Sequence, residues 1–473
     1  MTAVDYLIVG AGASAMAFLD VMFEATDATF AVIDKRPAPG GHWNDAYPYV
    51  RLHQSSVNYG AVSRHLGTTR IETTGVNAGL REGASGYEIA AYFHGLMREV
   101  FVPSGRVRYF PMSEHVGGGE FVSLLSRERQ RIEHGTIVDA TLVDTSIPLT
   151  HTRSFAVAQD VVCIPPNDLP RHAPAFERFT VLGGGKTAYD AVIFLLTNGC
   201  EPDRIRWVIP RDAWMINRLS AQCGPEFYGA IARFLADQQE ACATATDLDD
   251  LFARFEACRW CLRLDEQVWP TMFHAATISE GELEQCRLVH DVVRLGRVRE
   301  IAEGALALDG GVLPAAPGTL YVDCTATALG KLRTAQPVFS PERIAIQWVR
   351  QFQPTFSGAM IGRIEATIAD PDEKQRLAQP FPMTDTSADW VRGAVPAMEN
   401  ERNWLRHPEL RAWLSSCRLN AFGNTFLLEP PDDEARANRQ RVSATGKAAL
   451  ENLRRLAAGL TPNGADTGTA TST

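Results

Sequence analysis

The stretch YLIVGAGASA at residues 6–15 decides the fold of this 473-residue chain. Its apolar start predicts a buried strand and its glycine-rich centre a tight turn. The apolar run that follows, to about residue 25, predicts a helix. The run FAVID at residues 30–34 predicts a second strand. Short apolar runs that alternate with a helix are typical of a parallel strand–helix–strand unit.

The small residues of this turn suit the binding of a dinucleotide. Gly10 permits the tight turn, Gly12 lets a diphosphate approach the backbone, and Ala15 allows the helix to pack closely on the strand. The helix N-terminus offers amide donors and a partial positive charge to the diphosphate. Asp34 follows Gly10 by 24 residues and ends the second strand, where a carboxylate accepts hydrogen bonds from an adenosine ribose. The first unit is therefore predicted to bind a dinucleotide.

A second copy of the pattern begins with FTVL at residues 179–182 and continues through GGGKTA at residues 183–188. A helical pattern then ends near Asn198-Gly199, and IRWVI at residues 205–209 predicts the closing strand. The second turn starts 173 residues after the first. Such a pair predicts two nucleotide sites in one chain.

The second turn contains Gly185-Lys186-Thr187, which resembles the end of a phosphate-binding P-loop. That motif needs a glycine five residues before its final glycine, and Thr180 stands there inside a predicted strand. The turn is therefore interpreted as a second dinucleotide turn, built on Gly183 and Gly185.

The second unit differs from the first at the end of its closing strand. No acid stands there, and the chain continues with Pro210 and Arg211. An arginine at this edge suits the 2′-phosphate of NADPH, while a solvated surface charge is the alternative interpretation. We therefore expect tightly held FAD in the first unit, and NADPH, which visits as a hydride donor, in the second.

Composition and charge limit the classes of partner. Hydrophobic residues make up 45% and charged residues 22%, as in soluble globular domains. The net charge of −10 is a poor match for nucleic acid or an anionic membrane surface, which favours a small-molecule substrate. Nine cysteines, none before Cys163, indicate free thiols in a reducing compartment. With neither a targeting segment nor about 18 consecutive apolar residues, we expect a soluble cytoplasmic protein.

These patterns predict an α/β fold with two Rossmann-like dinucleotide-binding units, a helical insertion and a helical C-terminal region. Residues 292–301 and 306–312 are predicted strands of the second unit, with a turn at Asp309-Gly310-Gly311. The expected division is a first part of the FAD-binding unit at 1–165, an NADPH-binding unit at 175–335 with the helical insertion at about 220–290, a return to the FAD-binding unit with C-terminal helices at 336–458, and a disordered tail at 459–473.

Residues 34–43, DKRPAPGGHW, and residues 55–59, SSVNY, resemble the matching segments of class B flavoprotein monooxygenases. These are the flavin-containing, Baeyer–Villiger and N-hydroxylating enzymes. In that family an acid followed by Gly-Gly-x-Trp leads from the adenosine to the flavin ring. The second glycine turn and residues 322–326, VDCTA, are similar to the family's NADPH unit and its return strand.

The chain differs from this family at positions that the family uses for cofactor binding and catalysis. The Phe-x-Gly-x-x-x-His fingerprint of Baeyer–Villiger enzymes is absent before the second turn, where residues 175–179 are AFERF. His53 stands where those enzymes place an aspartate. Gln54 stands where flavin-containing monooxygenases place an asparagine near the flavin. No redox cysteine pair follows the first unit, which argues against the related disulfide reductases.

The resemblance implies that NADPH reduces FAD and that the reduced flavin reacts with O₂ to give a C4a-(hydro)peroxide. One oxygen atom then passes to nitrogen, sulfur or a carbonyl carbon of a small molecule. An oxidase or dehydrogenase that uses FAD without an oxygenating peroxide is a second hypothesis. A third is a regulator that binds the cofactors without catalysis. The departures from the family keep the second and third hypotheses open.

The candidate catalytic residues are His53, as an acid or base near the ring, and Gln54, as a hydrogen-bonding amide. The pair Cys258 and Cys261 lacks a second pair at zinc-ligand spacing and is interpreted as structural, so no metal ligands are expected. The candidate cofactor-binding residues are Gly10, Gly12, Ala13, Ser14, Ala15, Asp34, Lys35, Gly41, His42 and Trp43 in the first unit, and Gly183, Gly185, Lys186, Thr187, Arg211, Thr325 and Ala326 in the second.

Overall fold

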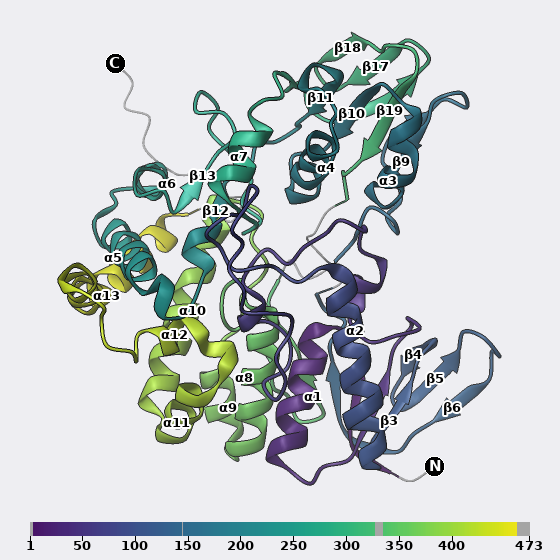
Figure 1. The fold of residues 1–473 in the computed structure, drawn as a ribbon. Helices are drawn as coiled ribbons and strands as arrows, with labels where there is room; N and C mark the ends of the chain where they lie inside the picture. The colour runs from purple at the N-terminus through teal and green to yellow at the C-terminus, as the bar shows by residue number, and fades with distance from the viewer. Residues whose placement is uncertain (1–2, 144, 327–333, 461–473) are drawn as a thin grey trace.

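Two parallel sheets organise the protein, whose computed structural model describes residues 3–143, 145–326 and 334–460 (Figure 1). Every neighbouring pair of strands in the first sheet is parallel. The strands across it are β20 (Arg343–Ala345), β7 (His134–Asp139), β1 (Val4–Val9), β2 (Phe30–Ile33) and β3 (Val107–Phe110). The helix α1 (Ala13–Ala25) connects β1 to β2 and begins directly after the first glycine turn.

The second sheet repeats this order, again with parallel neighbours. The strands across it are β9 (Cys163–Ile164), β19 (Thr319–Asp323), β10 (Arg178–Leu182), β11 (Ile205–Val208) and β15 (Asp291–Val293). Here β10 takes the place of β1, and α4 (Lys186–Thr197) takes the place of α1. The predicted α/β fold class is confirmed, because parallel strands and helices alternate around both glycine turns.

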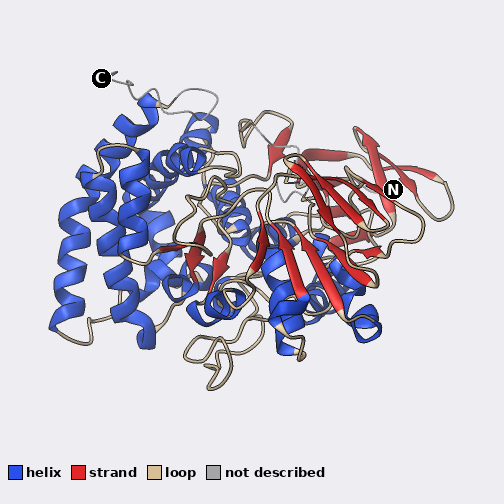
Figure 2. Ribbon diagram, turned by 90° about the horizontal axis from the view of Figure 1, so that it is seen from above, coloured by secondary structure: helices blue, strands red, loops and turns tan. Residues whose placement is uncertain are grey.

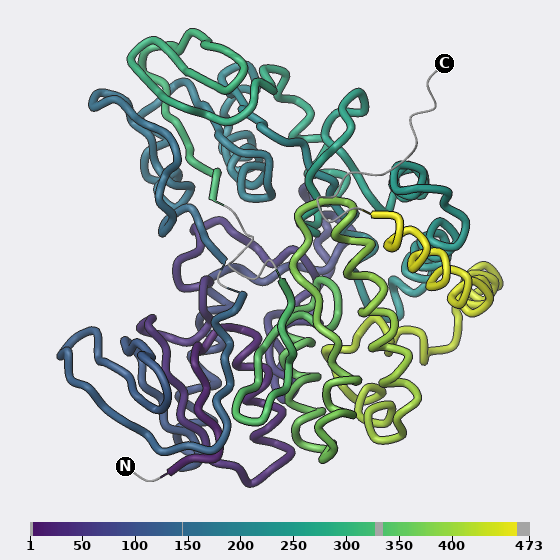
Figure 3. The backbone as a smooth tube through the Cα atoms, turned by 180° about the vertical axis from the view of Figure 1, so that it is seen from behind, coloured from purple at the N-terminus to yellow at the C-terminus, as the bar shows by residue number. Residues whose placement is uncertain are grey.

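The helix α8 (Pro354–Thr367) packs against α1, although the two lie far apart in the sequence. Figure 3 shows the green segment that contains α8 beside the purple N-terminal strands. A Cβ at Gly358 would collide with the carbonyl oxygen of Ser14, so only glycine permits this approach. Phe18 and Phe356 are fully buried in the shared core, where each such side chain contributes about 1.5–3 kcal/mol. The contact holds the N-terminus of α8 at the edge of the first sheet.

Three smaller sheets and the remaining helices complete the fold. The strands are β4 (Ser113–Gly117), β5 (Glu120–Ser123) and β6 (Arg129–Arg131) in one sheet, β8 (Ala156–Val157), β16 (Val298–Ala302), β17 (Ala305–Leu308) and β18 (Gly311–Pro314) in another, and β12 (Met215–Asn217), β13 (Cys261–Leu262) and β14 (Thr277–Ile278) in a third. The helices are α2 (Gly86–Leu96), α3 (Leu169–His172), α5 (Tyr228–Thr244), α6 (Leu248–Ala257), α7 (Glu280–Cys286), α9 (Pro371–Leu377), α10 (Ser387–Arg406), α11 (Pro408–Ser416), α12 (Ala421–Thr425) and α13 (Asp433–Gly459).

The helices of the insertion and of the C-terminal region gather on one side of the molecule, and the larger sheets lie on the other (Figure 2). The helix α13 lies along α5, so the end of the described chain returns to the insertion. Their shared core is aromatic, with Trp214, Phe252 and Trp390 buried together. The helical insertion that the sequence predicts thus packs on the C-terminal helices.

One strand prediction in the second unit is wrong. Residues 292–301 belong to two strands, β15 and β16, in different sheets, because Gly296 turns the chain between them with a φ of +80°. The turn predicted at Asp309-Gly310-Gly311 is present, and it divides residues 306–312 between β17 and β18. The predicted tail lies outside the described residues from 461 onward, and residue 459 ends α13. None of the helices within the described ranges is long and apolar enough to cross a membrane.

Candidate cofactor sites at two glycine turns

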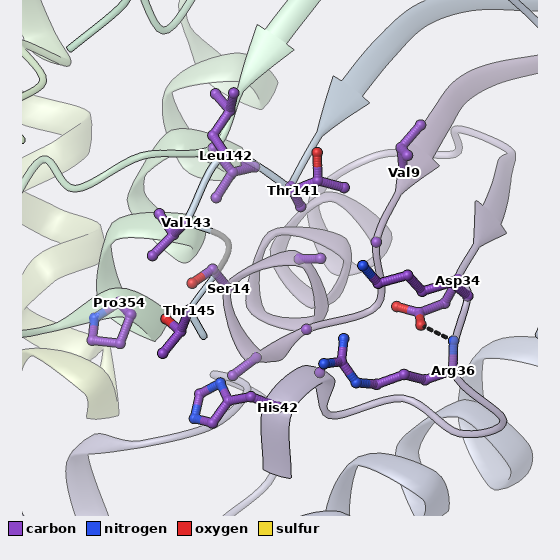
Figure 4. A pocket seen from close by; sticks show the side chains of 18 of the residues that line it. Val9, Ser14, Asp34, Arg36, His42, Thr141, Leu142, Val143, Thr145 and Pro354 are labelled. Atoms are coloured by element: carbon purple, nitrogen blue, oxygen red, sulfur yellow. Dashed lines mark hydrogen bonds between the residues drawn. The ribbon is translucent and has the colours of Figure 1, made fainter. Parts of the chain in front are cut away.

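A cavity of about 590 Å³ lies at the carboxyl edge of the first sheet (Figure 4). Strands β1, β2, β7 and β20 all end at this edge, which is where open parallel sheets bind ligands. The volume lies within the usual range for cofactor sites. Of the residues predicted for the first unit, the cavity is lined by Gly10, Gly12, Ala13, Ser14, Ala15, Asp34, Lys35, Gly41 and His42.

The N-terminus of α1 faces this cavity without a capping side chain. Gly10 leaves β1 with a φ of +96°, and Gly12 stands at the N-cap, where no described side chain accepts an amide of the first turn. Those amides and the helix dipole are therefore available to an anion. Gly41 lies close by, since a Cβ on it would stand 3.0 Å from Gly12 Cα. The turn suits the diphosphate of a dinucleotide.

Asp34 stands at the edge of the cavity and is itself buried. One carboxylate oxygen accepts the amide of Ala11 at 2.5 Å, and the other accepts the amide of Arg36 at 2.7 Å. These two bonds fix the plane of the carboxylate next to the glycine turn, as Figure 4 shows for the bond to Arg36. Each oxygen keeps a second lone pair for a ligand hydroxyl. The position agrees with the predicted role at an adenosine ribose.

Charged side chains surround the same end of the cavity. Arg36 donates through Nε to Oδ2 of Asp45 at 2.7 Å, and Lys35 stands beside it in the lining. Burial lowers the pKa of His42 to about 4, and the nearby Arg36 adds to this shift. His42 is therefore neutral at physiological pH. His115 also lines the cavity, and its Nε2 bonds to the carbonyl oxygen of Gly118 at 2.6 Å.

Another part of the cavity wall is formed by aromatic residues and by the N-terminus of α8, whose Pro354 lies near His42 in Figure 4. Tyr59 and Trp348 line it together with Pro354, the first residue of α8. Trp43 does not line the cavity but donates through Nε1 to the hydroxyl of Tyr59 at 2.8 Å. Because that bond holds the Tyr59 ring in place, Trp43 supports the cavity wall from behind.

One buried polar atom of this lining has no partner, since the indole nitrogen of Trp348 bonds to no described residue. Oε1 of Gln353 and Oγ1 of Thr355, on either side of Pro354, are also buried and unpaired, but these residues do not line the cavity. Leaving such a group unpaired costs about 1–3 kcal/mol, so groups like these commonly meet a ligand or water. A flat heteroaromatic ring with its own donors and acceptors fits this lining, and the residues of the cavity as a whole fit FAD.

The second glycine turn shows the same open N-terminus. Gly183 leaves β10 with a φ of +128°, and a Cβ there would stand 2.6 Å from the carbonyl oxygen of Cys324. Gly185 is the N-cap of α4, again without a capping side chain. A Cβ on Gly185 would meet no atom within 4 Å. The turn therefore combines unpaired helix amides with open space in front of them, as a second dinucleotide site requires.

The charged residues predicted for this second site already have partners. Arg211 donates to Oδ1 of Asp385 at 3.0 Å and to the carbonyl oxygen of Thr271 at 2.8 Å. The side chain of Thr325 donates to Asp323 at 2.6 Å, while Thr187 and Ala326 are half-buried near the turn and the return strand. The ammonium of Lys186 is directed to Oδ1 of Asp190. The structure thus turns Lys186 toward the protein interior.

A buried charged cluster lies at the seam between the two units, and we call it the seam cluster. Its members are Lys186, Asp190, Arg218 and Glu282, with Tyr47 and Asn77 as neutral partners. Arg218 holds Glu282 through two bonds of 2.8 and 2.7 Å. Burial alone would raise the pKa of Glu282, but Lys186 and Arg218 outweigh it and lower the pKa to about 2. The cluster pairs two cations with two anions.

The candidate catalytic residues lie toward this seam and not in the first cavity. His53 Nε2 stands 3.9 Å from Oδ2 of Asp190, and its carbonyl oxygen accepts the hydroxyl of Thr277. Atoms from both units surround the ring, yet 36% of the side chain remains accessible to water. Burial and the charge of Lys186 lower the pKa of His53 to about 4. Gln54 is half-buried beside it.

Sequence reasoning did not predict the seam cluster. Ser279 and Glu282 form a capping box on α7, a pattern that already explains the glutamate as a helix cap. Asp190 stands one turn into α4, where an acid after a lysine is a common surface pair. Only the tertiary packing brings these acids together with Arg218. No local signal in the sequence indicates their burial.

The cysteine pair Cys258 and Cys261 lies beside the aromatic core of the insertion. Both are free thiols, and burial raises the pKa of each. Within the described ranges, no cysteine lines the first cavity, and no three metal-ligating side chains come together. The pair therefore packs as small apolar side chains do.

No protein-family model matches the chain. Among curated proteins it is 42% identical over 439 residues to the uncharacterized protein Rv2000 of Mycobacterium tuberculosis, a match that covers 93% of this chain and 81% of that protein. The uncharacterized protein Mb2023 of Mycobacterium bovis matches with the same values.

Solved structures to which the chain is similar include two monooxygenases and a disulfide reductase. An open structure of cyclohexanone monooxygenase has a TM-score of 0.43 and 11% identity, covering 96% of this chain and 99% of that one. An oxidized steroid monooxygenase bound to NADP has a TM-score of 0.43 and 12% identity, with coverages of 97% and 98%. A bacillithiol disulfide reductase from Bacillus cereus has a TM-score of 0.41 and 14% identity, with coverages of 78% and 100%.

Proposed function

The chain belongs to the same family as the mycobacterial protein Rv2000, and we propose that it is an FAD- and NADPH-dependent monooxygenase of small molecules. The observation that carries this proposal is the pair of uncapped helix N-termini, each behind a glycine turn at the carboxyl edge of a parallel sheet. Two such turns in one chain suit one resident and one visiting dinucleotide. Balanced, the reaction consumes one substrate molecule, NADPH, a proton and O₂, and yields the singly oxygenated product, water and NADP⁺.

Three features of the first cavity support FAD as its ligand. The α1 N-terminus offers amides for the diphosphate, Asp34 offers a carboxylate for the ribose, and Trp348 offers an unpaired indole nitrogen for the flavin ring. The N-terminus of α8 adds a partial positive charge beside that ring site. FAD, when bound, supplies a hydride acceptor and the means to activate O₂.

Two features of the second turn support NADPH as the visitor. The space in front of Gly185 is open, and Arg211 stands at the end of β11, where a 2′-phosphate is read in related sites. Because Asp385 already pairs with Arg211, the phosphate has to replace this carboxylate as its partner. The exchange keeps Arg211 paired in both states.

The chain's own residues position and shield the reaction. Trp43 and Tyr59 hold the wall of the first cavity through their hydrogen bond. His53 presents a neutral imidazole, which can accept or hold a proton at a ring nitrogen, and Gln54 presents an amide that hydrogen-bonds without transferring a proton. The bonds of the seam cluster keep this segment against α4.

The rival functions receive less support. Disulfide reduction needs a thiol pair beside the flavin, and no cysteine among the described residues lines the first cavity. A simple oxidase or dehydrogenase takes electrons from its substrate and has no use for the second glycine turn. A non-catalytic regulator remains as the alternative if both cofactors bind without electron transfer.

Anaerobic stopped-flow spectroscopy followed by oxygen labelling tests the proposal. The FAD-loaded protein is mixed with NADPH under argon, and then with ¹⁸O₂ and a panel of amines, thioethers and ketones. We expect NADPH to bleach the flavin and one ¹⁸O atom to enter a product. Bleaching with only hydrogen peroxide as product would assign an oxidase. If NADPH does not bleach the flavin, the non-catalytic regulator is the remaining hypothesis.

A further inference from the structure

His42 faces the first cavity with a ring that lacks a partner. Neither ring nitrogen bonds to a residue in the described part of the chain, and the ring packs on Trp43 with centroids 5.1 Å apart. A neutral imidazole has one donor and one acceptor. His42 is half-buried in the cavity lining, so these two nitrogens are available to a polar ligand that enters the cavity.

The backbone places His42 next to the diphosphate position. Gly40 and Gly41, with φ values of +114° and +60°, bend the chain so that Gly41 lies against Gly12 at the N-terminus of α1. His42 follows on the short 3-10 helix Gly41–Asp45. In Figure 4 its ring points into the cavity, and the guanidinium of Arg36 extends toward it.

The charges around His42 are few. Each neighbouring element contributes one residue near the His42 ring. These residues are Arg36 after β2, Asp45 on the same short helix, Ser14 on α1, Thr145 after β7, Pro354 on α8 and Phe93 on α2. Arg36 and Asp45 are the charged members of this set, and they pair with each other at 2.7 Å. The other titratable residues that line the cavity are Asp34, Lys35, Tyr59, Glu114 and His115.

A dinucleotide diphosphate brings two negative charges to this site. Arg36 offers one positive charge, part of which Asp45 already offsets. The α1 N-terminus adds about half a charge. The groups beside the ring therefore fall short of the diphosphate by roughly one positive charge when the imidazole is neutral, and Lys35 is a further cation of the lining. A nearby dianion favours the charged form of a histidine, and a buried site strengthens that interaction.

We propose that His42 takes up a proton from solvent when FAD binds and, as imidazolium, forms an ion pair with the diphosphate beside Arg36. The inference rests on the proposed function, because it needs FAD in the first cavity. The proton enters a ring nitrogen and leaves again with the released cofactor. FAD affinity is thereby linked to pH.

The sign of this linkage follows from the two states of His42. The free protein binds this proton only below the low pKa of the buried ring, and the complex binds it at higher pH. Between the pKa of His42 in the free protein and its pKa in the complex, the complex therefore carries more protons. FAD binds more tightly as the pH falls through this interval. Full uptake of one proton makes the dissociation constant rise about tenfold for each unit of pH increase in that interval.

Calorimetric titration of the apoprotein with FAD tests the proposal. At about pH 6, binding enthalpies in buffers of different ionisation enthalpy give the number of protons taken up. We expect close to one proton in the wild type and close to none in His42→Gln, which still hydrogen-bonds. ADP-ribose carries the diphosphate without the flavin ring and should show the same uptake, whereas adenosine should show none.

A matched histidine in the same cavity provides the control. His115→Gln should keep the full uptake, because the ring of His115 already bonds to Gly118. Uptake by FAD but not by ADP-ribose would overturn the assignment to the diphosphate. FAD binding without proton uptake in the wild type, or equal uptake in His42→Gln, would overturn the inference alone. A wild type that binds no FAD at all would instead overturn the proposed function.

Discussion

The hydroxyl of Tyr47 donates a hydrogen bond of 2.6 Å to Oδ2 of Asp190, across the seam between the two units. Burial raises the pKa of Tyr47 well above its usual range, so this hydroxyl stays protonated and remains a donor. The other oxygen of Asp190, Oδ1, accepts a hydrogen bond from the ammonium of Lys186. Asp190 thereby ties a loop of the first unit to the helix that starts at the second glycine turn.

Removing Asp190 should destabilise the protein strongly. In Asp190→Ala, Lys186 keeps only Glu282, at 3.7 Å, to balance a side chain that is 6% exposed. We expect a loss of about 3 kcal/mol in the free energy of unfolding, measured by urea denaturation. Asp249→Ala, which removes an exposed acid on α6, should change it by less than about 0.5 kcal/mol. Equal effects of the two substitutions would contradict the role of Asp190.

A side chain at Gly12 should block FAD without harming the fold. Gly12 has an ordinary φ of −70°, and a Cβ there would meet Gly41 Cα only at 3.9 Å. Gly12→Val should therefore keep the wild-type thermal midpoint of the apoprotein and lose FAD uptake, measured by flavin absorbance after gel filtration. Full FAD occupancy in this variant would contradict the assignment of the first turn.

The corresponding change at Gly185 should separate the two cofactors. A Cβ there meets no atom within 4 Å, so Gly185→Val should fold and should still bind FAD. Its side chain would fill the space in front of α4, and we expect the rate of flavin reduction by NADPH to fall at least about tenfold. Wild-type reduction kinetics would place the nicotinamide cofactor elsewhere.

Arg211→Ala should impair the use of NADPH more than that of NADH. A charge-assisted bond to the 2′-phosphate contributes about 1.5–3 kcal/mol, and NADH has no such group. We expect KM for NADPH to rise by about tenfold or more, with a small change for NADH. Steady-state reduction assays with both cofactors measure the difference. A parallel rise for both would mean that Arg211 serves only its bond to Asp385.

Stability of the apoprotein should depend on pH in two separate intervals. The pKa of His53 is lowered from 6.5 to about 4, so the unfolded chain binds this proton first and stability falls as the pH drops from about 6.5 to about 4. The pKa of Glu282 is lowered from 4.5 to about 2, so its contribution is lost between those values. Thermal midpoints over this pH range measure both effects.

His53→Gln should remove the pH dependence of the thermal midpoint between about pH 6.5 and 4, and should leave the lower interval unchanged. The exposed His94 on α2 gives a matched control, and His94→Gln should leave the pH profile unchanged. An unaltered slope between pH 6.5 and 4 in His53→Gln would contradict the lowered pKa of this half-buried ring.

The local part of the fold could be predicted from the sequence. The glycine turn at Gly10 and Gly12, its helix and the acid Asp34 all lie within 35 residues, so their periodicity and spacing indicate the unit directly. The same holds for the turn at Gly183 and Gly185. The break of the predicted strand at Gly296 was missed. A glycine with a positive φ ends a strand without changing the apolar pattern on either side of it.

The rest of the site comes from strands that meet only in the folded sheet. Trp348 and Pro354 reach the first cavity because β20 returns beside β7, and nothing near them in the sequence indicates a cofactor. Lys186 was expected near a phosphate because it stands in a glycine turn, but its long side chain reaches buried acids instead. A long side chain can reach several partners that are distant in the sequence, and local spacing does not show which of them it contacts.

A spectroscopic titration under argon tests the central claim, that one chain holds FAD at its first turn and receives NADPH at its second. The apoprotein is saturated with FAD, free flavin is removed, and NADPH is added in steps while flavin absorbance is followed. We expect one FAD per chain and complete bleaching by one equivalent of NADPH. A protein that retains no FAD, or whose bound flavin stays oxidised with excess NADPH, would contradict it.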